Sequence, residues 1–182
     1  MVGVALDESV DAVAPHTDGI GFPVLLDRDH LLAELYAISN VPTVIWIDED
    51  DRIVRPNSVA FGTDTFIEFT GVASEPHKDA VRAWVRDGAA PMDAGDAKRA
   101  VEDLDGDEVA ARLHFRAAVH LRRIGREAAA ERHFQAAATL APMDFTIRRA
   151  AMPLRGGDPF GEEFFALYGE WEQAGKPYHG LG

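Results

Sequence analysis

The chain has a first half in which strand and helix patterns alternate and a second half that is helical throughout. Three short apolar runs predict buried strands: residues 2–6, 23–26 and 43–47. Three amphipathic segments predict helices: one capped by Ser9, one capped by Asp29, and one over residues 77–85 that stops at Gly88. This alternation favours an α/β domain at the start of the chain.

The second half follows a segment with the composition of a linker. Residues 87–96 are rich in Gly, Ala, Pro and Asp. Four helices are expected after it: residues 108–124, 127–140, 145–151 before Pro153, and 161–174. The last helix carries aromatic side chains at helical spacing that are expected to face a core: Phe164, Phe165, Tyr168 and Trp171. We therefore predict an α/β domain over residues 1–88, a linker over 89–107 and an all-α module over 108–182.

The composition excludes several classes of function. None of the 182 residues is cysteine, so this chain holds no disulfide, thiol nucleophile, cysteine zinc site or iron–sulfur cluster. Acidic residues exceed basic residues by 31 to 18, which argues against a nucleic-acid partner. Apolar runs such as residues 44–47 are far shorter than the roughly 20 residues that span a bilayer. We expect a cytoplasmic protein without a membrane partner, because no signal peptide is visible.

Residues 41–54 carry the most specific pattern in the chain. Val41-Pro42-Thr43 precedes a strand-forming run, an acidic turn and a second strand that begins at Ile53. This order resembles the second half of thioredoxin-like TlpA/ResA-type thiol–disulfide oxidoreductases and their peroxiredoxin (AhpC/TSA) relatives, although Asp51 stands where they have a turn glycine. The resemblance covers about residues 1–88. It implies a cis Val41-Pro42 peptide bond and a substrate groove lined by Val41, Pro42 and Thr43.

The same resemblance implies that the catalytic centre lies outside these residues. In thioredoxin folds the nucleophile follows a strand that precedes the one matched by residues 2–6. That strand also lies between the strands matched by residues 2–6 and 43–47. Those two runs must therefore pair directly, or a partner must fill the gap. The fold class is thus α/β thioredoxin-like, incomplete at its N-terminus, followed by an all-α tetratricopeptide-like module.

Three explanations of the missing nucleophile stay open. The chain is a fragment, its start has been placed at a later methionine, or it is a redox-dead remnant. A specific form of the second explanation involves selenocysteine. The chain resembles bacterial ResA-like proteins with a Trp-Ala-x-Ser-Sec-Gly-Met-Pro motif, whose selenocysteine is encoded by a stop codon.

The helical half resembles a single tetratricopeptide repeat. The repeat would span residues 111–144 and match these positions: Ala118, Gly125, Ala130, Phe134, Ala137 and Pro142. A plain helical hairpin is the alternative. Residues 108–150 carry a net charge of +4, whereas residues 1–107 carry −14. We expect the arginines of this module to contact the acidic first unit, or to remain solvated, rather than to bind an acidic partner.

Other residue patterns are weaker. His30 and Glu34 have an i, i+4 spacing that metals can use, but no third ligand is evident. The acidic run from Asp48 to Asp51 lacks the alternating ligands of a calcium loop and predicts a turn. His114 and His133 belong to the helical hairpin and are expected to serve packing or the surface. No metal site and no cofactor are predicted.

The sequence thus predicts the C-terminal part of a thiol- or selenol-dependent disulfide oxidoreductase or peroxidase-like protein. Its substrate would be a protein or peptide disulfide or a peroxide. These residues alone are expected to be redox-inactive, because they include no cysteine. The alternative is a non-catalytic interaction module in which the helical tail binds a protein partner. A homo-oligomer is compatible with both.

Overall fold

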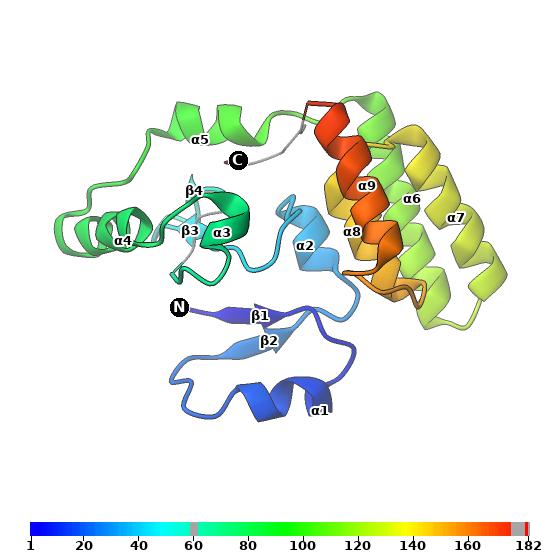
Figure 1. Ribbon diagram of the computed structural model, residues 1–182, viewed down its shortest axis with the longest axis horizontal. Helices are drawn as coiled ribbons and strands as arrows, with labels where there is room; N and C mark the ends of the chain where they lie inside the picture. Colours follow the sequence, from blue (N-terminus) through cyan, green and yellow to red (C-terminus); the bar gives the residue numbers. More distant parts are fainter. Residues whose placement is uncertain (59–61, 176–180, 182) are drawn as a thin grey trace.

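The computed structural model describes residues 1–58, 62–175 and 181, and helices make up about half of the chain (Figure 1). Residues 176–180 and 182, at the end of the predicted 108–182 module, lie outside the described residues. The strands form two small sheets: β1 (Gly3–Ala5) with β2 (Val24–Leu26), and β3 (Trp46–Ile47) with β4 (Ile53–Arg55). None of the helices among the described residues is long and apolar enough to cross a membrane.

The first sheet is a short parallel pair. β1 and β2 run parallel, with Gly3 opposite Val24 and Ala5 opposite Leu26. Helix α1 (Val10–Val13) and a turn of 3-10 helix (Ala14–His16) connect them. As predicted, the Ser9 hydroxyl caps α1 by accepting from the Ala12 backbone N–H at 3.3 Å. The predicted alternation of strand and helix is therefore confirmed in this part of the chain.

The second sheet is an antiparallel hairpin. One Asp48 carboxylate oxygen accepts from the backbone N–H groups of Asp50 and Arg52, at 3.0 and 2.9 Å. Asp51 takes φ +60°, the left-handed conformation that glycine usually supplies, and aspartate tolerates it better than most residues. The acidic run is thus a turn, as the sequence predicts.

The two sheets are separate. Among the described residues, β1 pairs only with β2 and β3 only with β4. The sequence leaves two outcomes open: residues 2–6 pair directly with 43–47, or a partner fills the gap between them. Direct pairing does not occur in this structure. β1 and β3 therefore each keep one edge without a strand partner in the described part of the chain.

Two local predictions in the first unit need correction. Asp27, not Asp29, caps α2 (Leu31–Leu35), because its carboxylate accepts from the backbone N–H groups of Leu31 and Ala33 at 2.9 and 3.1 Å. Asp29 instead forms an ion pair with Arg123 at 2.9 Å. The predicted linker over 89–107 contains a helix, α5 (Ala94–Val101), which packs against β4.

Two further helices precede the linker, α3 (Ile67–Thr70) and α4 (Glu75–Asp87). Helix α4 begins two residues earlier than the predicted segment 77–85. Gly88 follows it with φ +65°, and its backbone N–H bonds to the Trp84 carbonyl. This left-handed end is the stop that the sequence predicts.

The helical module is built on a hairpin of α6 (Gly106–Arg123) and α7 (Glu127–Leu140), with α8 (Phe145–Leu154) packed across it (Figure 1). Asp105 and Glu108 form a reciprocal capping box at the start of α6. The core of the helical module combines small and aromatic side chains of α6 and α7 with apolar side chains of α8. Its buried residues are Ala111, Phe115, Ala118, Val119, Ala130, Phe134, Ala137, Ala141, Ile147, Ala150 and Leu154. Small residues allow the helices to approach closely, as the pattern predicts.

Two details of the last helices differ from prediction. Helix α8 continues through Pro153, because Met152 and Leu154 on either side are buried and hold the last turn in place. Helix α9 (Glu162–Gln173) packs its aromatic stripe on Phe145, except for Phe165, which is 60% exposed. The stripe is therefore core in three of its four positions.

The arginines of α6 join the helical module to the acidic first unit. The buried Arg112 guanidinium donates to both Asp144 carboxylate oxygens, at 2.7 and 3.3 Å, and to the Glu34 carbonyl at 2.7 Å. Arg116 donates to the Glu34 carboxylate at 2.6 and 3.1 Å. Glu34 is only 2% exposed, whereas the Arg116 side chain remains 43% exposed, so the Glu34 side of this contact between α2 and α6 is buried. The expected contact of the basic helices with the acidic unit is confirmed.

Candidate functional site

The predicted groove residues form an exposed loop directly before β3. Val41 and Pro42 are exposed and Thr43 is half-buried. The Val41-Pro42 peptide bond is cis, which confirms that expectation. The three consecutive residues therefore lie in one loop, exposed at Val41 and Pro42 and half-buried at Thr43.

Hydrogen bonds fix this loop to the segment that follows β4. The Asn40 side chain donates to the carbonyls of Pro42 and Ser58, both at 3.0 Å. The Thr43 hydroxyl donates to the Ser58 carbonyl at 2.9 Å and accepts from the Ser58 N–H at 3.0 Å. The Asn57 side chain donates to the Ala37 carbonyl at 2.8 Å and is fully buried. The loop is thus held at both of its ends.

Thr43→Val is expected to destabilise the protein by about 1–3 kcal/mol, because it removes the hydroxyl that accepts from the N–H of the buried Ser58 and donates, together with Asn40, to the Ser58 carbonyl. The measurement is urea unfolding. Thr63→Val is the matched control, since the Thr63 hydroxyl is exposed and its hydrogen-bond partner among the described residues is the exposed Thr65 hydroxyl, and we expect a change within about 0.5 kcal/mol. Equal effects of the two substitutions would contradict the assigned role of Thr43.

Behind the loop, β3 is supported by a cluster of aromatic and basic side chains. The buried Trp46 stacks on Trp84 of α4, with ring centroids 5.2 Å apart, and meets His77 edge-on at 5.5 Å. Arg55 lies opposite Trp46 across the hairpin, with its guanidinium carbon 5.5 Å from the Trp46 ring centroid. The Trp46 Nε1, Arg55 Nη1 and His77 Nδ1 atoms are buried and have no hydrogen-bond partner among the described residues. The cluster packs β3 against α4.

Burial lowers the pKa of two histidines, His77 in the Trp46 cluster and His30 at the start of α2. Burial lowers the pKa of His77 below its usual 6.5, and the nearby Arg55 lowers it further. Burial also lowers the pKa of His30, where Asp27 acts in the opposite direction. Both imidazoles are therefore held neutral in the folded chain at pH values where they would protonate in the unfolded chain.

The free energy of unfolding is expected to fall as the pH decreases from 7.5 to 5.5. Below about 6.5 the unfolded chain takes up protons on His30 and His77 that the folded chain does not bind, so the stability present above that pH is lost. Chemical denaturation at several pH values measures this slope. His30→Gln and His77→Gln together should flatten it, whereas His120→Gln, at an exposed position, should leave it unchanged. A slope that the double variant retains would refute the assignment.

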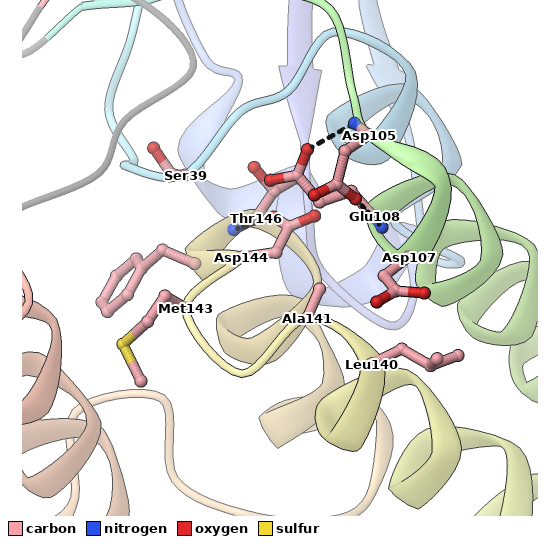
Figure 2. A pocket seen from close by; sticks show the side chains of 10 residues that line it. Ser39, Asp105, Asp107, Glu108, Leu140, Ala141, Met143, Asp144 and Thr146 are labelled. Atoms are coloured by element: carbon pink, nitrogen blue, oxygen red, sulfur yellow. Dashed lines mark hydrogen bonds between the residues drawn. The ribbon is translucent and has the colours of Figure 1, made fainter.

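An acidic cavity of about 210 Å³ lies beside the buried Ser39, at the starts of α6 and α8 (Figure 2). Three of its four acidic residues, Asp105, Glu108 and Asp144, have structural roles. Asp105 and Glu108 satisfy each other's backbone N–H groups, both at 2.8 Å, as the dashed lines in Figure 2 show. Asp144 is bound by Arg112 and also accepts from the Thr146 N–H at the start of α8. These three carboxylates therefore cap the starts of α6 and α8.

The described residues contain no cluster of three or more histidine, cysteine, aspartate or glutamate side chains arranged to hold a metal ion. The His30 and Glu34 spacing is not a metal site, because the Glu34 carboxylate is occupied by Arg116. Sequence reasoning missed Asn40, Ser58 and the Trp46 cluster. Two features of the sequence could have indicated them. An asparagine stands just before Val-Pro, and tryptophan, arginine and histidine stand in or near the two strands of the hairpin.

Comparison with known proteins gives no assignment. A scan against protein-family models, a search of curated proteins and a search of solved structures each found no match.

Proposed function

We propose that these residues are the substrate-binding, C-terminal part of a thioredoxin-like oxidoreductase of the TlpA/ResA type. The nucleophile, a cysteine thiolate or selenolate, belongs to residues other than these 182. It attacks one sulfur of a substrate disulfide, forms a mixed disulfide and releases the second sulfur as a thiolate. With a peroxide, it attacks one oxygen and is oxidised while the other oxygen leaves.

The observation that carries the proposal is the separation of the two sheets. β1 and β3 each pair on one side only within the described residues. In the thioredoxin-like arrangement a strand lies between their counterparts, and the nucleophile follows that strand. β1 also has the nearly continuous apolar sequence of a strand that is covered on both faces, yet Val4 is 38% exposed. An additional strand beside β1 would fill its open edge, and the helix that follows that strand would cover the exposed Val4 face.

The loop before β3 supports the same proposal. Val41 and Pro42 are exposed, and Asn40 and Thr43 fix the loop against Ser58. In this function the Val41 backbone would pair with an extended peptide, while Thr43 and Pro42 line the groove. Residues of this chain would thus bind and orient the substrate, and the electron transfer would take place at the nucleophile.

Two observations on the native protein test the proposal. The gene is read in frame upstream of the Met1 codon, through any stop codon, and the mass of the protein is measured in its natural source. We expect a strand-forming run followed by a codon for cysteine or a UGA codon for selenocysteine, and a protein larger than 182 residues. Absence of such coding sequence would refute the proposal and leave a non-catalytic interaction module.

A further inference from the structure

We propose that His114 and His133 form a binding site for a divalent transition-metal ion, Zn²⁺ in the first instance, between α6 and α7. The two Nδ1 atoms lie 2.8 Å apart, and the ring centroids are 4.9 Å apart with an interplanar angle of 40°. The proposal is independent of the proposed oxidoreductase function, because both residues belong to the helical module.

The geometry brings two ring nitrogen atoms from different helices within hydrogen-bond distance of each other. In the neutral pair one Nδ1 carries a proton and donates it in a hydrogen bond to the other. When a metal ion binds, both Nδ1 lone pairs face the ion. The proton of the donor ring then moves to its Nε2 atom, so no net proton is released. Neutral imidazole is a suitable ligand for zinc, copper and nickel.

The required rearrangement is small. Zinc–nitrogen bonds of about 2.0–2.1 Å in tetrahedral geometry place two ligand nitrogens roughly 3.3 Å apart. The Nδ1 atoms therefore need to separate by about 0.5 Å, which side-chain rotation of two half-buried rings can provide.

The hairpin holds the two ligands in place. α6 and α7 run side by side over their length (Figure 1), and their contact is fixed by Phe115, Ala118, Ala130 and Phe134 in the core. Because the ligands come from different helices, a bound ion links α6 to α7. The remaining coordination positions are filled by water, since no third protein ligand completes a cluster in the described part of the chain.

The test is a Zn²⁺ titration of the full chain in competition with a fluorescent zinc indicator. We expect one ion per chain. In His133→Ala we expect the Kd for Zn²⁺ to rise at least about tenfold, because loss of a residue that only orients a ligand already weakens metal binding by about that factor. His120→Ala is the matched control, because His120 is an exposed histidine of α6 outside the pair, and its Kd should not change. Circular dichroism verifies the fold of each variant.

A second variant and a second measurement keep the test decisive. His114→Gln retains a hydrogen-bonding group beside His133 but removes one ligand, and it should lose Zn²⁺ affinity to the same extent. Zn²⁺ should raise the Tm of the wild-type protein and of His120→Ala, but not of His114→Gln or His133→Ala. Equal Zn²⁺ affinity in all four proteins would overturn the proposal and place the ion on the acidic surface.

Discussion

Replacing Arg112 with alanine is expected to lower the free energy of unfolding by about 3–5 kcal/mol, because it leaves buried carboxylate and carbonyl groups without their cation. Arg112 is 4% exposed and Asp144 is 5% exposed, and their two hydrogen bonds are desolvated. Arg112 also donates to the Glu34 carbonyl on α2. The substitution therefore weakens the helical module and its contact with the first unit together.

Urea or thermal unfolding measures this loss, which corresponds to a decrease in Tm of roughly 6–20 °C for a chain of this size. Arg122→Ala is the control, since Arg122 pairs with the exposed Glu8 at 3.3 Å, and its loss should cost less than about 1 kcal/mol. If Arg112→Ala costs no more than Arg122→Ala, the buried network does not stabilise the fold.

Phe115→Ala is expected to destabilise the protein by about 3–5 kcal/mol. Phe115 is 1% exposed and packs edge-on against Phe134, with ring centroids 6.0 Å apart. The closely packed alanines around it cannot extend into the space that the ring leaves, so the substitution creates a cavity at the centre of the α6–α7–α8 core.

Phe165→Ala is the matched control for Phe115→Ala. Phe165 is 60% exposed, so its removal should cost less than about 1 kcal/mol. Both variants are measured by denaturant unfolding, and the slope with denaturant should remain that of the wild type if only the folded state is affected. A small loss in Phe115→Ala would mean that the core collapses around the missing ring.

Helix ends and turns were predicted well wherever their cause is local. Ser9 caps α1, Gly88 ends α4, and the Asp48–Asp51 segment is a turn, because each depends on residues within four positions. The predicted cap at Asp29 failed for the opposite reason. Asp29 pairs with Arg123, a residue 94 positions away, and the carboxylate of Asp27 accepts from the first N–H groups of the helix instead.

The candidate site was predicted in part. Val41, Pro42 and Thr43 were identified from their pattern, and the structure places them in one exposed loop. The hydrogen bonds that hold this loop could not be predicted. Asn40 and Thr43 bind Ser58, and Ser58 follows a hairpin whose register is not visible in the sequence. Glu34 was considered as a metal ligand, and only the packing of α2 against α6 assigns it to Arg112 and Arg116.

The sequence by itself determined the α/β first half, the helical second half and the small-residue pattern of the hairpin core, since these follow from local propensity and periodicity. The tertiary structure decided which groups meet across long sequence separations. It separated the two sheets, paired His114 with His133, and buried Arg112 between Asp144 and Glu34. Such contacts depend on how helices and strands pack in three dimensions, and the spacing of residues along one chain does not specify that packing.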